Sequence, residues 1–385
     1  MKITLNTKEA VKALARGVKA IPAKIINPRD GDVLITADND SITLTTTDGE
    51  MAVVTVLKTS GKAGNPVETA GTALMDAKKL LEMLGVIADD TVTLETSADG
   101  CTASVLFSNG KHSMPSFAPD WFPPVEFSVK DPVTVELPAK LLSDILSGTL
   151  FNCLNDPLRP VFGSILMELG KNGTDIVTSD MKSLMVHSLP DIKSETPVTF
   201  LLSQKQGNLL LSAVKTLKEE DDMVTVNIGD KKAVFTAGDS TVSTKSVNSK
   251  FPDWKRILPD KNPNELTIKK DEFLSTLRRV STCAGISQRC VKLSIRKTLV
   301  DSTMEVSASD SGFKISARET MPVDYSGEDM TIGFNADVLL DIVKHIDGES
   351  VTIGLTDAKK PALITPTEKK DNMTVRAVLV PVFTR

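Results

Sequence analysis

The chain has 385 residues, of which 41% are hydrophobic and 25% charged, a composition typical of a globular protein with two to four domains. No uncharged apolar run is long enough to span a membrane, and the amino terminus lacks the apolar stretch of a signal peptide. The net charge is −5 and aromatic residues make up 4%, which argues against a surface that stacks single-stranded bases. The four cysteines are widely spaced without a CxxC pair, as expected for free thiols in a reducing cytoplasm.

The first third of the chain shows strand and helix patterns in a fixed order. Residues 3–14 alternate like a short strand and then take the spacing of an amphipathic helix, and residues 42–48 alternate again and end in an aspartate. Residues 76–84 have helical spacing and precede an acidic turn and an alternating strand at 92–94. We therefore expect a module in which strand, helix and strands follow one another twice.

The same order returns in the middle and last thirds of the chain. The leucines Leu14, Leu146 and Leu277 occupy equivalent helix positions, which gives a period of about 130 residues. The recurring segments are 135–146, 175–180, 204–214 and 224–226 in the middle third, and 266–277, 304–310, 335–343 and 351–353 in the last third. Three copies of one module are therefore predicted.

An aspartate ends the mid-module strand in each copy, at Asp48, Asp180 and Asp310. A carboxylate in that position can accept hydrogen bonds from the backbone of the turn that follows. We therefore expect a structural role for these three residues.

Each module is predicted to hold two helices and about eight antiparallel strands, which is an α+β fold. Clusters of proline, lysine and aspartate place the module boundaries so that the modules are residues 1–127, 128–262 and 263–385. Three open sheets would expose strand edges to aggregation. Two chains that pair edge to edge into a six-module ring would remove these edges, and an open array of capped repeats is the alternative.

Positive charge is concentrated in two of the predicted helices. Segments 7–20 and 204–218 each have a net charge of +3, although the whole chain is negative. If such helices share one surface, that surface attracts phosphates, and without a sequence-reading motif the contact with DNA is expected to be non-specific. A solvated helix face is the alternative. The candidates by charge placement are Lys8, Lys12, Arg16, Lys205, Lys215, Arg278 and Arg279.

Four segments resemble one family. Residues 251–259 (FPDWKRILP) resemble the linker between the second and third domains of bacterial DNA sliding clamps, the β subunit of DNA polymerase III. Residues 332–341 (IGFNADVLLD) resemble the helix motif of their third domain, 155–163 (NDPLRPVFG) the entry into their second domain, and 380–382 their apolar carboxyl-terminal segment. The resemblance covers all three modules.

This resemblance implies a head-to-tail homodimer whose six modules and twelve helices surround duplex DNA. It implies a cytoplasmic, nucleoid-associated processivity factor of DNA replication, which a clamp loader places on DNA and which tethers polymerases and other proteins through their short apolar peptides. By analogy, the dimer contact lies between residues 102–107 and 283–289. The resemblance also adds Lys24 and Arg159 to the candidate DNA-facing residues, at positions where relatives carry arginine.

The resemblance further implies a peptide pocket between the second and third modules. A concave apolar groove with a few polar groups suits an extended peptide with leucine and phenylalanine anchors. Core packing is the alternative for single members such as Leu184, Ile257 and Val380. Carried over residue by residue, the pocket comprises Phe162, Ser179, Met181, Lys182, Ser183, Leu184, Pro252, Arg256, Ile257, Asn335, Val338, Val378, Val380, Pro381 and Val382.

The chain departs from the family's pattern around this pocket. The family's Thr-Asp-Gly-His-Arg-Leu run is SDMKSL at 179–184, and two tyrosines of relatives are Pro160 and Val161 here. The family's Met-Pro-Met-Arg-Leu end is VPVFT at 380–384, followed by Arg385. We therefore expect an altered peptide preference, as in a divergent bacterial or a phage-encoded clamp.

No motif points to catalysis. The three histidines, His112, His187 and His345, are far apart, and the sequence has no HExxH, P-loop, GxSxG or GxGxxG motif. We expect no catalytic residue, metal or cofactor. Two other function classes stay open from the residues alone: a structural or adhesive repeat protein that does not bind DNA, and an uncharacterised enzyme with a dyad built across modules.

Overall fold

The computed structural model describes residues 1–22, 24–25, 27–38, 41–57, 67–259, 262–297, 301–368, 370 and 372–382. Residues 260–261, at a predicted module boundary, and residues 383–385, in the altered carboxyl-terminal segment, lie outside the described residues. The chain forms two compact units, one of residues 1–146 and 202–246, the other of residues 147–201 and 247–385. The middle third of the chain therefore contributes to both units.

Among the described residues, each third of the chain has the predicted order of a strand and a helix, four or five strands, a second helix and three strands. The first third has β1 (Lys2–Asn6), α1 (Thr7–Ala20), η1 (Pro28–Gly31), β2 (Asp32–Ala37), β3 (Ile42–Thr47), β4 (Met51–Leu57), β5 (Val67–Thr69), β6 (Gly71–Asp76), α2 (Ala77–Gly85), β7 (Thr91–Thr96), β8 (Thr102–Phe107), β9 (Gly110–Pro115) and η2 (Pro119–Trp121). The middle third has β10 (Val133–Pro138), α3 (Ala139–Thr149), η3 (Leu150–Asn152), β11 (Ser164–Gly170), β12 (Gly173–Ser179), β13 (Ser183–Leu189), β14 (Val198–Ser203), α4 (Gln204–Val214), β15 (Met223–Ile228), β16 (Lys232–Ala237), β17 (Ser240–Lys245) and η4 (Trp254–Ile257). The last third has β18 (Asn264–Lys269), α5 (Lys270–Ser281), β19 (Cys290–Lys297), β20 (Ser302–Asp310), β21 (Ile315–Tyr325), β22 (Met330–Asn335), α6 (Ala336–His345), β23 (Ser350–Leu355), β24 (Ala362–Pro366) and β25 (Thr374–Leu379).

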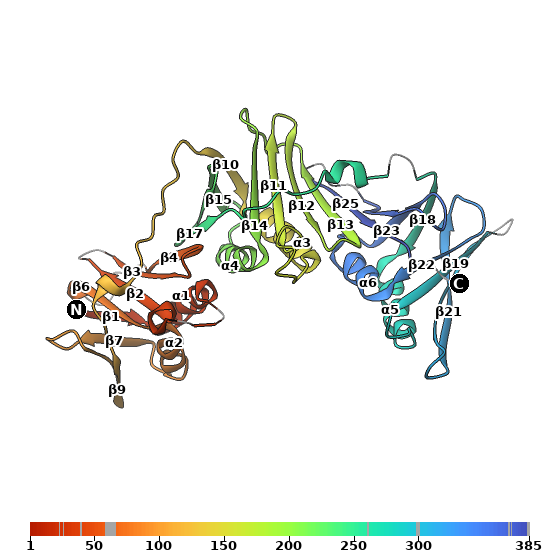
Figure 1. The fold of residues 1–385 in the computed structure, drawn as a ribbon. Coiled ribbons are helices and arrows are strands. Elements are labelled where there is room, and N and C mark those ends of the chain that lie inside the picture. The colour runs from red at the N-terminus through yellow and green to blue at the C-terminus, as the bar shows by residue number, and fades with distance from the viewer. Residues whose placement is uncertain are drawn as a thin grey trace. The chain divides into compact units, whose positions relative to one another are not determined.

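Antiparallel pairing joins the described strands into three sheets. Their orders are β5-β1-β7-β8-β9, β10-β15-β16-β17-β4-β3-β2-β6, and β14-β11-β12-β13-β25-β24-β23-β18-β21-β20-β19-β22. Consecutive thirds are joined edge to edge, because β17 pairs with β4 in the first unit and β25 pairs with β13 in the second. In the second unit, α5 and α6 lie side by side (Figure 1). The fold is α+β, as predicted.

Equivalent residues of the three copies occupy equivalent places in the core. Leu14, Leu146 and Leu277 are all fully buried, as the shared helix pattern predicts. Helix α1 begins at Thr7 because the side chain of Asn6 accepts a hydrogen bond from the backbone N–H of Glu9, which satisfies a donor of the first turn. The repeat is therefore visible in packing as well as in sequence.

The three aspartates shape turns, as predicted. One carboxylate oxygen of each accepts two backbone N–H groups of the turn: Asp48 from Glu50 and Met51, Asp180 from Lys182 and Ser183, and Asp310 from Gly312 and Phe313. These bonds fix the turns that lead into β4, β13 and β21. No helix in the described part of the chain is long and apolar enough to cross a membrane.

Candidate functional site

The joint between β13 and β25 brings together two groups of predicted pocket residues. The two strands pair antiparallel, with Ser183 opposite Leu379 and Leu184 opposite Val378. Past the end of β25, the N–H of Val380 donates to the carbonyl of Lys182 at 3.0 Å. The segments 179–184 and 378–382 therefore form one continuous surface in the second unit.

The turn between β12 and β13 is held by its own polar groups. The hydroxyl of Ser179 donates to the carbonyl of Ser183 at 2.7 Å and accepts the N–H of Met181 at 3.1 Å. Met181 has a φ of 72°, a left-handed conformation that is unusual for a residue with a side chain. Its thioether sulfur lies 2.8 Å from an Nη of Arg159. The turn thus presents Met181 and Arg159 next to each other.

The linker at 251–258 is fastened to this unit by a buried tryptophan. Trp254 is 4% exposed, and its indole N–H donates to Oε2 of Glu168 at 3.0 Å, while Lys255 donates to the other oxygen at 2.8 Å. Burial alone would raise the pKa of Glu168, but the hydrogen bonds from Lys255 and Trp254 outweigh it, so that this pKa lies below its usual value. The anchored linker places Ile257 at the surface.

Three apolar side chains at the predicted pocket positions are about half exposed. They are Met181, Ile257 and Val380, with exposed fractions of 49%, 43% and 47%. Leu184 and Val378 are instead buried and belong to one core cluster with Trp254, so for Leu184 the core-packing reading holds. Met181, Ile257 and Val380 are therefore the large apolar side chains of the set that are most exposed to a partner.

The remaining predicted pocket residues differ in exposure and in whether their polar atoms are already bonded within the fold. Asn335 caps α6, because its Oδ1 accepts the N–H groups of Asp337 and Val338 and its Nδ2 donates to the carbonyl of Gln288. Its polar atoms are thus used within the fold.

The rings of Phe162 and Phe251 meet edge to face at 6.5 Å. Pro252, Lys182 and Arg256 are exposed, Val338 and Val382 are half-buried, and Pro381 is buried. The binding role of the whole set stays a prediction.

Arg16 does not belong to the DNA-facing set, and this expectation is wrong. The side chain was expected on the exposed stripe of α1, but Arg16 is 6% exposed and forms an ion pair with Asp239 in the turn between β16 and β17, at 3.0 Å. Periodicity within α1 could not show this partner, because it comes from a hairpin more than two hundred residues later.

The other cationic candidates are exposed, and several are paired. Lys205 contacts Asp48 at 2.6 Å, and Arg279 makes two bonds to Glu319 at 2.8 and 2.6 Å. Lys8, Lys12, Lys24, Arg159, Lys215 and Arg278 are also exposed. We expect the paired residues to be less available to a phosphate than Lys12, Lys24, Lys215 and Arg278.

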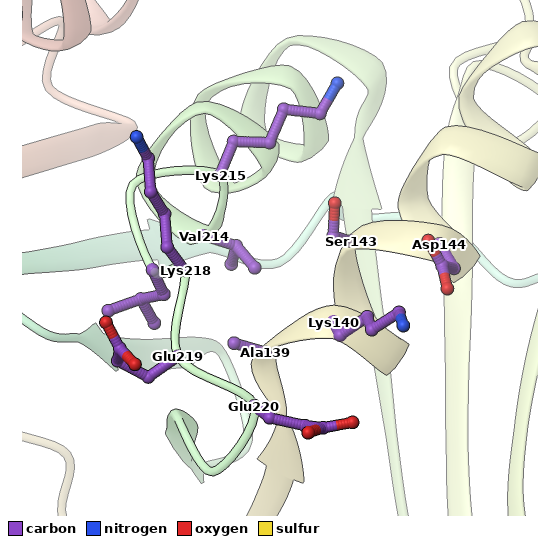
Figure 2. A pocket seen from close by; sticks show the side chains of 10 residues that line it. Ala139, Lys140, Ser143, Asp144, Val214, Lys215, Lys218, Glu219 and Glu220 are labelled. Atoms are coloured by element: carbon purple, nitrogen blue, oxygen red, sulfur yellow. The ribbon is translucent and has the colours of Figure 1, made fainter.

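A cavity of about 450 Å³ lies between the start of α3 and the end of α4 in the first unit. Three lysines line it, Lys140, Lys215 and Lys218. Figure 2 shows the amino groups of Lys215 and Lys218 on the side away from the carboxylates of Glu219 and Glu220. Lys140 and Lys218 are absent from the candidate set above, although the high charge of 204–218 already included Lys218.

The described histidines are separate and do not form a metal site. His187 is buried in β13, and burial lowers its pKa from 6.5 to about 4, although nearby Asp347 acts in the opposite direction. His345 stacks on Phe151 at 4.2 Å, and His112 meets Phe107 edge to face. Among the residues that the structure describes, no group of three or more His, Cys, Asp and Glu side chains could hold a metal ion.

Two models of one protein family match the chain. The N-terminal domain of the DNA polymerase III beta subunit matches residues 1–127, and its C-terminal domain matches residues 255–382. A beta sliding clamp from Halalkalibacterium halodurans is 22% identical over 357 residues, which are 92% of this chain and 93% of that protein.

Solved structures share the fold over the full length of both chains. A DNA polymerase sliding clamp from Bacillus subtilis has a TM-score of 0.89 at 19% identity, with 100% of each chain covered. A sliding clamp (DNA polymerase III subunit beta) from Pseudomonas aeruginosa, bound to griselimycin, has a TM-score of 0.89 at 22% identity, again with 100% of each chain covered. At these identities the likeness establishes the fold.

Proposed function

This chain belongs to the DNA polymerase III beta subunit family, and we propose that it is a DNA sliding clamp, a processivity factor that encircles duplex DNA and tethers polymerase and other proteins to it. The observation that carries the proposal is the family match in both terminal thirds together with a fold shared over the whole length. We infer that it catalyses no reaction, uses no cofactor, acts on cytoplasmic DNA in the nucleoid, and is placed there by a clamp loader.

Phosphates of duplex DNA are the partner that suits the exposed lysines. Lys12 of α1 and the cavity lysines Lys140, Lys215 and Lys218 are exposed cations on or beside helices. Lysines without a base-reading motif contact the backbone whatever its sequence, and such contacts weaken as salt rises. We therefore assign Lys140 and Lys218 to the DNA-facing set in addition to the residues predicted from the sequence.

The surface around Met181, Ile257 and Val380 is the proposed peptide-binding site. Its half-exposed apolar side chains belong to a hydrogen-bonded turn, an anchored linker and the segment after β25. A preformed apolar surface suits a short extended peptide, because little ordering is needed on the protein side. The proposed modules, 1–127, 128–262 and 263–385, place this site at the junction of the second and third.

The proposed homodimer would use the two sheet edges that correspond to the joints within the chain. Within the described residues, β9 is an edge strand paired with β8 alone, whereas β8 is paired on both sides, so the expected contact at 102–107 moves to β9. Among the residues that the structure describes, strand β21 pairs with β18 only at Asp324 and Tyr325, and the other side of its first half has no paired strand. Ile286, Phe313 and Ile315 are exposed near this edge, so burial by a second copy would remove apolar surface from water.

The joints within the chain predict the register of this contact. Val53 of β4 lies opposite Val242 of β17, and Met185 of β13 lies opposite Ala377 of β25. In the third copy, Ala317 holds the position of Val53 and Met185, because each of the three pairs with the residue two positions before its turn aspartate, namely Ala308, Thr46 and Thr178. Strand β9 corresponds to β17, because each follows a hairpin whose loop has two residues. We infer that Ala317 lies opposite His112 of the partner copy.

The clamp proposal is tested on DNA circles. The purified protein is loaded onto nicked circular DNA with a clamp loader and ATP, and the DNA is then cut once. A ring stays on the circle and slides off the linear product. Equal retention on circular and linear DNA would contradict the topological mechanism, and a mass of one chain by light scattering at micromolar concentration would contradict the homodimer.

A further inference from the structure

The joint between β4 and β17 repeats the bonding of the joint between β13 and β25. The N–H of Lys245, the last residue of β17, donates to the carbonyl of Glu50 at 2.9 Å. The N–H of Val380 donates in the same way to the carbonyl of Lys182 at 3.0 Å. Lys245 and Glu50 in the first unit therefore correspond to Val380 and Lys182 in the second.

The two turns at these joints also match. The hydroxyl of Thr47 donates to the carbonyl of Met51 at 2.8 Å, as Ser179 does to Ser183. The residue midway between the two hydrogen-bonded residues has a positive φ in both turns, 86° at Gly49 and 72° at Met181. Positions 47–52 thus correspond to positions 179–184, which include five of the proposed peptide-site residues.

The linkers that follow share a motif as well. Pro-Asp-Trp occurs at 119–121 and again at 252–254, one repeat period later. This alignment makes Pro124 the counterpart of Ile257, which is half exposed in the proposed peptide site. The turn, the strand end and the linker of that site therefore each have a counterpart in the first unit.

A cavity of about 320 Å³ lies at these counterpart positions. It is lined by Thr47, Gly49, Glu50, Met51, Ala52, Pro123, Pro124, Val125, Glu126, Lys232, Ser243 and Lys245. We propose that this cavity is a second peptide-docking site, which takes a short extended segment of a partner protein with an apolar anchor and an acidic flank. The inference rests on the proposed peptide-binding function of the site around Met181.

The apolar wall of the cavity would hold the anchor. Met51 and Ala52 form a buried floor, and the linker residues Pro123, Pro124 and Val125 face it. A Cβ atom added to Gly49 would meet nothing within 4 Å, so the space that the Met181 side chain takes in the other joint is open here. The linker is held in place because the hydroxyl of Ser243 donates to the carbonyl of Glu126 at 3.1 Å.

The rim favours an acidic flank. Lys245 stands where the other site has Val380, and Lys232 adds a second cation. Their carboxylate partners are loosely held, with Glu50 at 3.4 Å and Glu126 at 3.6 Å, and both glutamates are more exposed than the lysines. Exposed ion pairs of this kind contribute little to stability, so a carboxylate of a peptide can replace them.

The exposed Trp121 supplies a local reporter. Its counterpart Trp254 is 4% exposed and bonded to Glu168, whereas Trp121 is 67% exposed and lies two residues before Pro123. These are the two tryptophans of the protein. Fluorescence that changes in the full chain but not in Trp121→Phe therefore reports on the first-unit cavity.

The test uses the full chain and two capped peptides, acetyl-Asp-Asp-Ser-Leu-Phe-amide and acetyl-Lys-Lys-Ser-Leu-Phe-amide. Calorimetry counts the peptides bound per chain, and fluorescence follows Trp121. Pro124→Glu and Lys245→Glu block the proposed cavity, and Ile257→Asp is the matched change in the other site. Lys245→Val gives the cavity the residue of its counterpart, and thermal unfolding checks that each variant is folded.

We expect two acidic peptides per chain, and one after Pro124→Glu, Lys245→Glu or Ile257→Asp. Lys245→Val keeps both sites but reduces the preference of the cavity for the acidic peptide by about tenfold. The inference is overturned if Ile257→Asp abolishes all binding, if both cavity variants keep two peptides, or if the basic peptide binds the cavity more tightly. If Ile257→Asp leaves two peptides while Pro124→Glu leaves one, the cavity stands and the proposed site around Met181 fails.

Discussion

The guanidinium of Arg16 in α1 and the carboxylate of Asp239 in the β16–β17 turn form an ion pair of 3.0 Å that is largely removed from solvent on the arginine side. This contact fastens the first helix of the chain to a hairpin of the middle third, next to the paired strands β4 and β17. It gives Arg16 a structural role at the joint.

Removal of one partner of this pair should destabilise the first unit. In Asp239→Asn the buried guanidinium loses its counter-charge, which we expect to lower the free energy of unfolding by about 2 kcal/mol, less than for a fully buried pair because Asp239 is partly exposed. Urea unfolding measures the loss. Retention on circular DNA should be unchanged in the folded fraction, and an unchanged free energy of unfolding would contradict the structural role of Arg16 at the joint.

Lys215 and Lys218 should contribute to the salt dependence of DNA binding. Each phosphate contact releases a counterion, so Lys215→Ala or Lys218→Ala should reduce the slope of log affinity against log salt by about 1. Fluorescence anisotropy with duplex DNA between low and physiological salt measures this slope. The matched control is Lys171→Ala, which removes an exposed lysine of the β11–β12 turn in the other unit. An equal change in the control would show that only net charge matters.

The inferred dimer register places Lys111 opposite Arg318 of the partner copy, one residue along from the Ala317–His112 pair. Like charges on directly opposite residues of an antiparallel pair repel, so Lys111→Glu should tighten the dimer by about 1 kcal/mol, roughly fivefold in Kd, and the gain should shrink as salt rises. Sedimentation equilibrium measures the dimer affinity. A weaker dimer, or the same gain from Lys171→Glu, would rule out this register.

The buried His187 should make the second unit sensitive to mild acid. Its pKa falls from 6.5 to about 4 on folding, so between these values the unfolded chain binds more protons than the folded one. Stability is therefore complete above pH 6.5 and is lost as the pH falls to about 4, by about 3 kcal/mol in total. Urea unfolding of His187→Gln between pH 4 and 7.5 should show a flatter profile than the parent, and His112→Gln serves as the control. Parallel profiles in parent and His187→Gln would contradict the assignment.

The elements and their order could be predicted from the sequence, because the alternation of strands and the spacing of helices recur three times with one period. The helix leucines at 14, 146 and 277 and the three turn aspartates behave as predicted, since local backbone geometry decides their roles. Local sequence patterns do not reveal contacts between residues that are far apart in the chain. The partner of Arg16 lies in a distant hairpin, and Leu184 is buried in a core cluster that also holds the linker tryptophan Trp254.

The candidate peptide site was predicted only through its resemblance to a family, and the structure sorted its members by exposure. Ile257 and Val380 are exposed while Leu184 is buried, although all three are aliphatic residues in similar sequence surroundings. The exposure of a side chain at a joint depends on which strand edge is paired there. The pairing between thirds of the chain decides this, and the hydrophobicity of the residue does not. The cavity by Gly49 and Pro124 had no motif to mark it, and only the matching bonds of the two joints made it recognisable.

The N–H bonds of Lys245 and Val380 have a consequence for how the proposed ring would break. Strand β9 ends in Pro115 at the position that Lys245 holds in β17. Proline has no N–H, so the proposed contact between two copies would lack the bond that closes both joints within a chain. The proposed contact between copies would therefore have one hydrogen bond fewer at the end of its strands than either joint within the chain. We expect strand separation to begin there, so a loader that opens the proposed ring would need least work at the contact between copies.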